Sequence, residues 1–333
     1  MYMDKTTEYI WLYRDKDKTS FFRDLVSEKN HFFICLPAYK AVKTKAGRYW
    51  EKLMLGNRFR KMIPEKLRAR RYNIGNYEYL EDKTYVVLMG TQVVAHYSTS
   101  YLSMFKKEHP NVKLYAIACD SMHASSSHMD HVRDKLLSGV FDKVLTYDRF
   151  DAEEYGFTWF GYSYYSEMPY EITDRQPYDA YFVGIDKGNR GKTISSLYSF
   201  LVKNNVNVCF DVPRPKKNAQ EDFPYIKKGI PYSEVLGKVN CTNTLIEILQ
   251  SGQQSQSLRY FEAVKFNKKL LTNNRHLSEL PYYDERYMRF FETEDDIDIE
   301  WVKKVEEIDY GYKGEFSPLH LEQFLKSIED DHE

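Results

Sequence analysis

Short apolar runs alternate along the chain with segments whose apolar residues recur at the helical spacing of three and four positions. This alternation is typical of repeated βαβ units, in which helices connect the strands of a mainly parallel sheet. In the first half, the predicted strands are residues 31–36, 84–89, 113–119 and 143–147, and the predicted helices are residues 20–28, 98–108 and 128–138. The pattern therefore predicts a first α/β domain over residues 1–165.

Residues 166–177 carry two prolines and several charges, and we interpret them as a linker. After the linker, the predicted strands are residues 179–184, 206–212, 244–249, 268–272 and 287–291, and the predicted helices are residues 193–203 and 257–266. Ser317-Pro318 begins a final helix, because proline suits the first helical turn. We predict a second α/β domain over residues 178–312 and a C-terminal helix within residues 313–333 that packs back toward the first domain.

Composition agrees with a packed globular protein. The 333 residues are 42% hydrophobic and 29% charged, and their net charge of −1 gives no general attraction to nucleic acid. No apolar run has the length of a membrane span, and the N-terminus lacks the apolar stretch of a signal peptide, so we expect a cytoplasmic protein. Cys35, Cys119 and Cys209 lie in apolar strand-like runs, which predicts buried core residues rather than disulfides or zinc ligands.

The most informative segment is residues 246–274. A strand ends at Leu249, a loop rich in Gly, Gln and Ser follows, and a helix begins near Ser257. Free backbone N–H groups and the positive end of the helix dipole suit a diphosphate at such a place. Glu262 lies further along this helix, where its carboxylate can accept hydrogen bonds from a ribose diol. The residues predicted to bind the donor here are Ser255, Gln256, Ser257, Leu258, Arg259 and Glu262.

Glu262-Ala263, between this loop and residues 267–274, resembles the donor-binding region of GT-B glycosyltransferases from bacterial capsule and lipopolysaccharide gene clusters. Residues 181–188 and residues 141–157 are similar to the same group. The resemblance implies two Rossmann-like domains that face each other across a cleft. It also implies transfer of a sugar from a nucleotide sugar to a glycan or lipid-linked acceptor in surface polysaccharide biosynthesis.

In that family the resemblance implies that Glu262 holds the donor ribose and that residues 255–258 hold the diphosphate. UDP is the default donor nucleotide because it is the commonest in similar enzymes, and neither a metal nor another cofactor is expected. Many retaining members have a second glutamate eight residues before the ribose glutamate, and here that position is Gln254. Because an amide cannot act as a carboxylate, inversion and retention both stay open.

Residues 184–193 follow a predicted strand and end in Gly-Lys-Thr, so a P-loop kinase or NTPase is an alternative. The Walker pattern requires glycine where this chain has Asp186, and a carboxylate is unfavourable where backbone should wrap a phosphate. Lys187, Arg190 and Lys192 are instead candidates for neutralising the donor diphosphate, and Gly184 is a donor-binding candidate in the same loop. The alternative is an ordinary solvated loop.

Sugar transfer requires a base for the acceptor hydroxyl, and strand ends in the first domain are where we expect it. Asp120 follows the predicted strand 113–119, and His96 follows the strand 84–89 and its turn. Asp120-Ser121 resembles an Asp-Ser at this place in related bacterial enzymes, so we favour Asp120 over His96 as base or acceptor ligand. Either side chain could equally cap a loop.

Two groups of residues raise the question of a metal. The first is His123, His128, Asp130 and His131, which has neither a cysteine nor the H-E-x-x-H spacing, so a solvated helix face is the favoured interpretation. The second is the acidic run 295–298, which contains an Asp-x-Asp triplet but follows the predicted sheet and is expected at the surface.

Residues 40–72 contain twelve Lys or Arg against only Glu51 and Glu65, interleaved with aromatic residues. Such a segment suits an anionic membrane leaflet, a pyrophosphate-linked lipid carrier or RNA, or it is a cationic helical surface packed on its apolar side. We expect Arg68, Arg70 and Arg71 to recruit a lipid-linked acceptor at the inner face of the plasma membrane. A non-catalytic nucleotide- or RNA-binding protein is a further alternative, but it leaves the motifs of the second domain without a role.

Overall fold

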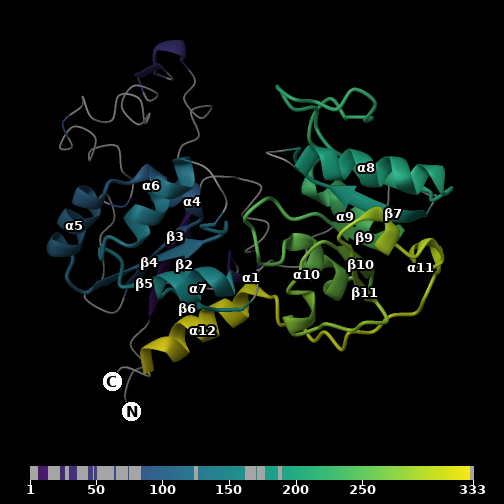
Figure 1. Ribbon diagram of the computed structural model, residues 1–333. Coiled ribbons are helices and arrows are strands. Elements are labelled where there is room, and N and C mark those ends of the chain that lie inside the picture. The colour runs from purple at the N-terminus through teal and green to yellow at the C-terminus, as the bar shows by residue number, and fades with distance from the viewer. Residues whose placement is uncertain are drawn as a thin grey trace. The chain divides into compact units, whose positions relative to one another are not determined.

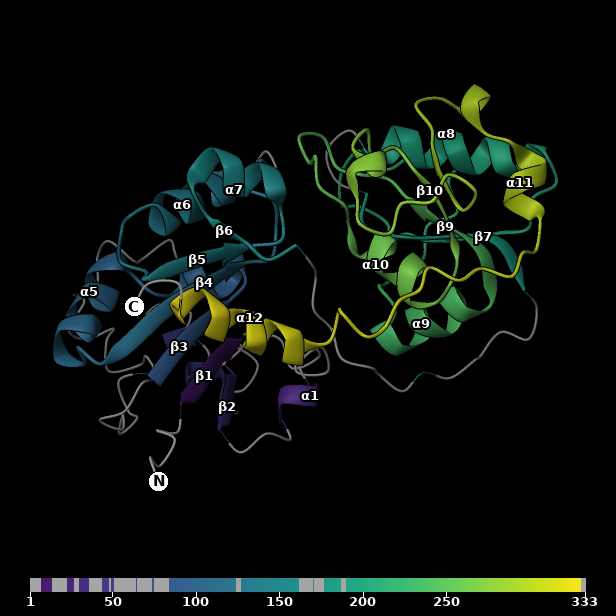
Figure 2. The same ribbon diagram turned by 90° about the horizontal axis from the view of Figure 1, so that it is seen from below.

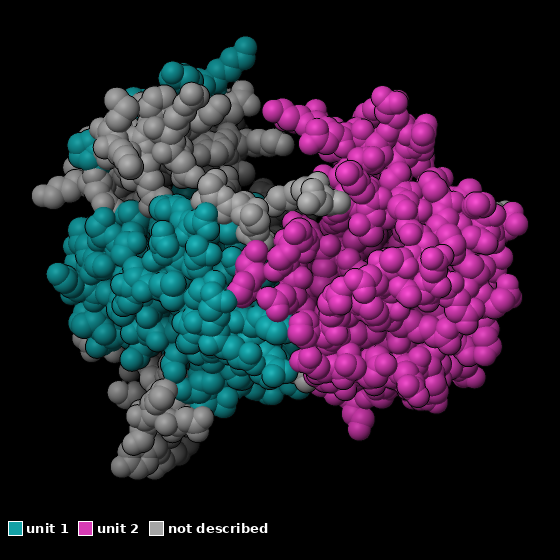
Figure 3. All heavy atoms as spheres, in the orientation of Figure 1, with its two compact units in different colours: residues 1–122, 126–167, 317–333 teal, residues 123–125, 168–316 magenta. Residues whose placement is uncertain are grey.

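The computed structural model describes residues 7–13, 23–26, 30–35, 44–47, 49–50, 64, 74, 84–123, 127–161, 170, 177–186 and 190–330. The chain divides into two compact units, coloured separately in Figure 3. Unit 1 comprises residues 1–122, 126–167 and 317–333, and unit 2 comprises residues 123–125 and 168–316. Each unit is built on a parallel sheet with helices packed against it (Figures 1 and 2).

The sheet of unit 1 has six strands in the order β2-β1-β3-β4-β5-β6, and all of its pairings are parallel. The strands are β1 (Glu8–Tyr13), β2 (His31–Cys35), β3 (Thr84–Met89), β4 (Val112–Ala118), β5 (Lys143–Thr146) and β6 (Thr158–Trp159). The helices are α1 (Arg23–Val26), α4 (Thr91–His96), α5 (Thr99–Glu108), α6 (Ser127–Leu136), α7 (Arg149–Tyr155) and α12 (Pro318–Asp330). Leu321 and Leu325 of α12 are buried in one cluster with Trp11 and Tyr85, so the last helix completes the core of the first unit.

The strand β1 lies between β2 and β3, although the sequence pattern predicted no strand before residue 31. Its side chains are buried on both faces of the sheet, and Trp11 donates a hydrogen bond from Nε1 to Nδ1 of His31 at 2.8 Å. The pattern missed this strand because Tyr9 and Trp11 are aromatic residues set among charges near the N-terminus, rather than an aliphatic run.

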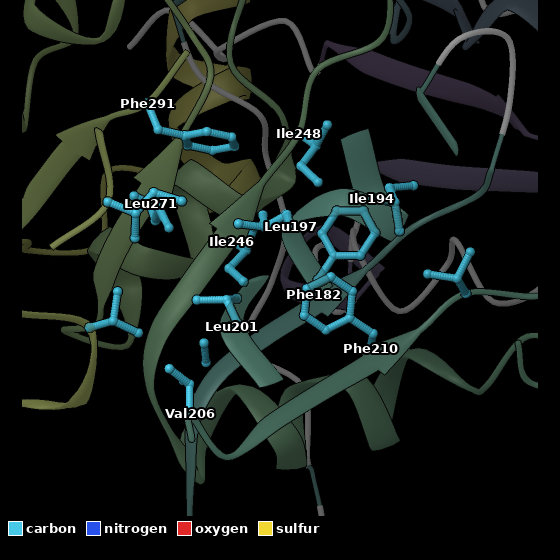
Figure 4. Packing of buried hydrophobic residues seen from close by; sticks show 14 of the residues in the cluster. Phe182, Ile194, Leu197, Leu201, Val206, Phe210, Ile246, Ile248, Leu271 and Phe291 are labelled. Carbon is cyan, nitrogen blue, oxygen red and sulfur yellow. The ribbon is translucent and has the colours of Figure 1, made fainter. Parts of the chain in front are cut away.

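Unit 2 has a five-stranded parallel sheet in the order β11-β10-β9-β7-β8. The strands are β7 (Tyr178–Val183), β8 (Val208–Asp211), β9 (Thr242–Glu247), β10 (Lys269–Thr272) and β11 (Met288–Phe290). The helices are α8 (Arg190–Lys203), α9 (Tyr232–Asn240), α10 (Leu258–Lys265) and α11 (Ile299–Lys303), with 3-10 turns η3 (Leu277–Glu279) and η4 (Glu294–Asp296). Figure 4 shows Ile194, Leu197 and Leu201 of α8 packed against the sheet beside Phe182 and Phe210.

Two expectations about the residues between elements were wrong or incomplete. Cys119 is exposed rather than buried, because β4 ends at Ala118 and leaves the cysteine in the following loop. The helix α9 lies in a segment for which the pattern predicted no element. None of the described helices is both long enough and apolar enough to cross a membrane.

Candidate functional site

A cavity of about 320 Å³ opens within unit 2, where β9 and β10 end and α8 begins. Its lining residues are Arg190, Thr193, Leu249, Gln250, Ser251, Gln253, Gln254, Asn273, Asn274, Arg275 and His276. In open α/β sheets, ligands bind outside the carboxyl ends of the strands, and this cavity has that position. Among these described residues are two arginines and no carboxylate, so the lining favours an anion.

Arg190, the first residue of α8, is the central cation of this cavity. Its guanidinium lies over the Phe182 ring at 5.2 Å and 3.0 Å from the point that a Cβ atom on Gly184 would occupy. Burial lowers the pKa of Arg190 to about 10, and the negative charge of Glu247 opposes that shift, so the side chain is a cation at neutral pH. Its Nε–H group is buried and has no acceptor among the described residues.

Asn274 supplies a second buried donor. Only 1% of the residue is exposed, and its Oδ1 atom accepts a hydrogen bond from the His276 backbone N–H at 3.0 Å. Its Nδ2 group donates to no acceptor within the described part of the chain. A buried donor without an acceptor costs about 1–3 kcal/mol, and a ligand that supplied oxygen atoms to these two donors would remove that cost.

Arg275 and His276 lie at the outer part of the lining. Arg275 forms an exposed ion pair with Glu292, and the Nδ1 atom of His276 lies 2.9 Å from a carboxylate oxygen of Glu279. Exposed ion pairs contribute little to stability, so either pair can exchange its carboxylate for a ligand oxygen at little cost.

Gly184 makes room for the guanidinium of Arg190 rather than offering a ligand of its own. A Cβ atom at this position would lie 2.9 Å from the Phe182 ring and 3.0 Å from Nη2 of Arg190.

We therefore expect Gly184→Ala to displace the guanidinium and to weaken anion binding about tenfold. The unfolding midpoint should change little, because the far ends of the Phe182 and Arg190 side chains can move. Isothermal titration with a nucleoside diphosphate measures the first effect. Gly229→Ala is the matched control, since nothing lies closer than 3.9 Å to its added Cβ, and equal weakening in both variants would contradict the assignment.

The N-terminus of α8 is closed by a carboxylate of the chain itself. The Asp186 side chain lies directly against Gly191, and Tyr225 donates its hydroxyl hydrogen to Asp186 Oδ2 at 2.6 Å. A phosphate held in the P-loop manner would need this space, so the P-loop alternative is not favoured. Lys192 is exposed and does not line the cavity, and Lys187 lies outside the described residues.

The N-terminus of α10, predicted to hold the diphosphate, is closed in the same way. The Ser257 backbone N–H donates to Oε1 of Glu247 at 2.6 Å, and the Ser257 side chain accepts from the Arg259 backbone N–H at 3.2 Å. None of the predicted residues Ser255, Gln256, Ser257, Leu258 and Arg259 lines the cavity. The preceding loop lines it instead, including Gln254. Glu247 was missed by the sequence analysis, and its only signal is one acidic residue inside the apolar run 244–249.

Glu262 is fully buried in this structure. Its carboxylate lies 2.5 Å from the guanidinium of Arg259 and accepts a hydrogen bond from the Tyr232 hydroxyl at 2.7 Å. Burial raises the pKa of Glu262, and the Arg259 charge opposes that shift. The ribose-binding role of Glu262 stays a prediction.

In unit 1, the two candidate bases occupy different places. Asp120 is exposed at the carboxyl end of β4, and its Oδ2 atom accepts a hydrogen bond from Thr91 Oγ1 at 2.6 Å. His96 is the last residue of α4, about 7.5 Å along the helix axis from Thr91 at the usual rise per residue. Its ring packs edge-on against Tyr97. The structure therefore places Asp120, but not His96, directly at a strand end.

Asp151 is a buried carboxyl group that the sequence analysis did not select. Its two oxygens accept hydrogen bonds from the Met122 backbone N–H at 2.9 and 3.1 Å, two residues after Asp120. Burial, and next the charge of Asp148, raise the pKa of Asp151 from 3.8 to about 7. The side chain therefore fixes the loop that carries Asp120 and changes charge near neutral pH.

This shift predicts a pH dependence of stability. The folded state holds the Asp151 proton up to about pH 7, whereas the unfolded chain releases it near pH 4, so the free energy of unfolding falls as pH rises between these values. We expect wild type to lose about 2–3 kcal/mol more than Asp151→Asn between pH 5 and pH 8. Urea unfolding at both pH values measures the difference. The exposed Asp130→Asn variant should lose as much stability between the two pH values as wild type does. An equal loss in Asp151→Asn and wild type would contradict the expectation.

The described residues contain no group of three or more His, Cys, Asp or Glu side chains arranged to hold a metal ion. The side chain of His128 lies outside the described part. In the acidic run 295–298, Asp296 accepts backbone hydrogen bonds from Glu292 and Thr293, and Asp298 caps α11. Arg68, Arg70 and Arg71 also lie outside the described residues, so the acceptor-recruiting role of the basic segment stays a prediction.

No protein-family model matches the sequence, and no curated protein matches it. Among solved structures, this chain is similar to the S. aureus MnaA–UDP co-structure, with 10% sequence identity and a TM-score of 0.52 over 96% of this chain and 97% of the other. A T4 phage BGT mutant in complex with UDP-glucose gives 11% identity and a TM-score of 0.48 over 89% and 88% of the two chains. The glycotransferase of kitacinnamycin gives 7% and 0.44 over 90% and 89%.

Identities this low show the fold alone, and the likeness to the MnaA co-structure covers nearly the whole of both chains. The chain has two parallel sheets in succession, each with helices packed against it, and the likeness to the MnaA co-structure extends over both. The chain has the GT-B fold of two Rossmann-like domains.

Proposed function

We propose that the chain is a glycosyltransferase that binds a nucleotide sugar in the cavity of unit 2 and transfers the sugar to a hydroxyl group of an acceptor. The observation that carries the proposal is the pair of buried donors beside this cavity, Arg190 Nε and Asn274 Nδ2. A diphosphate ester offers several charged oxygens to such donors, and charge-assisted hydrogen bonds are the strongest of their kind.

The remaining lining fits the other end of the donor. Amide and hydroxyl side chains dominate the loop from Gln250 to Gln254, together with Thr193 and Asn273. These groups both donate and accept hydrogen bonds, as the hydroxyl groups of a sugar require. In the reaction, Arg190 and Asn274 stabilise the negative charge that develops on the leaving diphosphate.

The acceptor hydroxyl must lose a proton, and we assign this step to Asp120 because it is exposed at the carboxyl end of β4. The sequence resemblance supports a glycan or lipid-linked acceptor in bacterial surface polysaccharide biosynthesis. UDP is the first nucleotide to test, both as the commonest donor carrier in the resembling enzymes and because the S. aureus MnaA co-structure contains it.

A thermal-shift panel of UDP, GDP, CDP, dTDP and ADP without metal, beside Mg-ATP, tests the donor site. We expect one nucleoside diphosphate to raise the unfolding midpoint without Mg²⁺. A response to Mg-ATP alone would overturn the proposal in favour of a nucleotide-dependent kinase. If a nucleotide sugar binds but is converted to another compound without any acceptor, the chain acts on the donor itself. That result would contradict the proposed transfer of the sugar to an acceptor.

A further inference from the structure

Glu247 is a fully buried carboxylate at the last position of β9. One oxygen accepts the Ser257 backbone N–H at 2.6 Å, and the other accepts the Thr272 hydroxyl at 2.6 Å. Burial raises the pKa of Glu247, and the hydrogen bonds from Thr272 and Ser257 and the charge of Arg190 oppose that shift by favouring the ionised form. Both hydrogen-bond donors are neutral, so they hold the carboxylate in place without cancelling its charge.

This charge lies behind the wall of the anion-binding cavity. Leu249 lines the cavity two residues after Glu247, and Asn273 and Asn274 line it directly after Thr272, which holds the Glu247 carboxylate. Glu247 is also the carboxylate that acts most strongly on the charge of Arg190. A negative charge behind this wall attracts Arg190 and repels an anionic ligand.

Two contacts besides the attraction of Glu247 orient Arg190. Its guanidinium is fixed by the Phe182 ring at 5.2 Å and by the close approach to Gly184. Removal of the Glu247 charge would therefore leave Arg190 directed as before and would remove mainly the repulsion of the ligand.

The repulsion differs between the donor and the product of the reaction. In a nucleotide sugar the terminal phosphate is esterified to the sugar. On transfer, the bond between the anomeric carbon and the phosphate oxygen breaks, and the oxygen keeps the electron pair. The acceptor oxygen bonds to the anomeric carbon and its proton passes to the base. The released phosphate has a second ionisation with a pKa of about 6, so the product carries more negative charge than the donor at neutral pH.

We propose that the negative charge of Glu247 lowers the affinity of the cavity for the nucleoside diphosphate product more than for the nucleotide sugar. Glu247 thereby promotes product release. This inference rests on the proposed function. It assigns to Glu247 an effect opposite in sign to that of a merely structural residue, whose loss would weaken binding.

The test compares wild type with Glu247→Gln, which is isosteric, and with Glu247→Asp, which keeps the charge. The glutamine oxygen can accept from the Ser257 backbone N–H, and its amide NH2 can donate to the Thr272 hydroxyl oxygen in place of the bond that this hydroxyl donates in wild type. Affinities are measured by isothermal titration for the nucleoside diphosphate that stabilises wild type and for its glucose ester. We expect Glu247→Gln to bind the diphosphate about tenfold more tightly and the ester no more than about threefold more tightly, because the repulsion between like charges is removed. Glu247→Asp should stay near wild type, and product inhibition of Glu247→Gln should increase.

Equal or weaker binding of the diphosphate by Glu247→Gln would overturn the inference, as would equal tightening for both ligands. If Glu247→Gln does not fold, Glu247→Ala serves as a second neutral variant with the same expectation. If wild type binds neither a nucleoside diphosphate nor inorganic pyrophosphate, the proposed function itself fails, which is a distinct result.

Discussion

Replacement of Arg190 by glutamine is expected to lower the affinity for the nucleoside diphosphate about a hundredfold, with the free energy of unfolding unchanged or slightly increased. The affinity falls because a charge-assisted hydrogen bond to a phosphate contributes about 1.5–3 kcal/mol. Stability should change little, because removal of a cation that burial disfavours offsets the lost attraction to Glu247. Isothermal titration and urea unfolding measure the two quantities.

Lys192→Gln is the matched control for this experiment. The residue lies two positions further along α8, carries the same charge and is exposed outside the cavity lining. We expect its affinity to change less than about threefold, since exposed charges near a site are largely screened. An equal loss in both variants would mean that general positive charge, rather than the buried Nε donor, attracts the nucleotide.

Glu262→Ala is expected to lower the free energy of unfolding by about 3–5 kcal/mol, because removal of one partner leaves the other buried charge uncompensated. That partner is Arg259, which is 7% exposed and lies 2.5 Å from the carboxylate. Urea unfolding at neutral pH checks this. The double variant Arg259→Met/Glu262→Leu should recover most of the loss, since an apolar pair of similar volume replaces the ion pair. A loss below about 1 kcal/mol in Glu262→Ala would contradict a desolvated ion pair.

This expected loss also decides how the ribose role of Glu262 has to be tested. Weaker nucleotide binding by Glu262→Ala would follow from local unfolding alone. Comparison of UDP with 2′-deoxyuridine diphosphate on folded wild type avoids this problem. If a carboxylate holds the ribose diol, loss of the 2′-hydroxyl should weaken binding about tenfold or more, because a buried acceptor is left unpaired. Equal affinities would leave Glu262 as the internal partner of Arg259 and Tyr232.

Most of the fold could be predicted from the sequence, because buried parallel strands are short apolar runs and their crossovers have the helical period. The prediction of residues 84–89 as a strand agrees with β3, and residues 98–108 differ from α5 by one residue. The strand β1 was missed because its buried side chains include the aromatic residues Tyr9 and Trp11. The hydrogen bond from Trp11 to His31 joins β1 to β2, so the sequence of neither strand alone indicates it.

The site could be predicted only as far as the edge of the sheet. The sequence indicated that residues between Leu249 and Ser257 follow a strand and precede a helix, and this loop does line the cavity. It did not indicate that Glu247 and Asp186 close the two helix N-termini. Whether a helix N-terminus is open to a ligand depends on side chains from strand ends and loops, and no local pattern encodes those contacts.

The contribution of α12 to unit 1 has a consequence for the order of folding. Leu321 and Leu325 belong to the same core cluster as Trp11, and Ser317 donates to Asp24 at 3.0 Å, so contacts of this unit join residues about 300 positions apart. During synthesis, residues 168–316 emerge from the ribosome before α12 does. The part of unit 1 that precedes them therefore waits with an apolar sheet face uncovered, and this is the interval in which a chaperone or an aggregate can capture it.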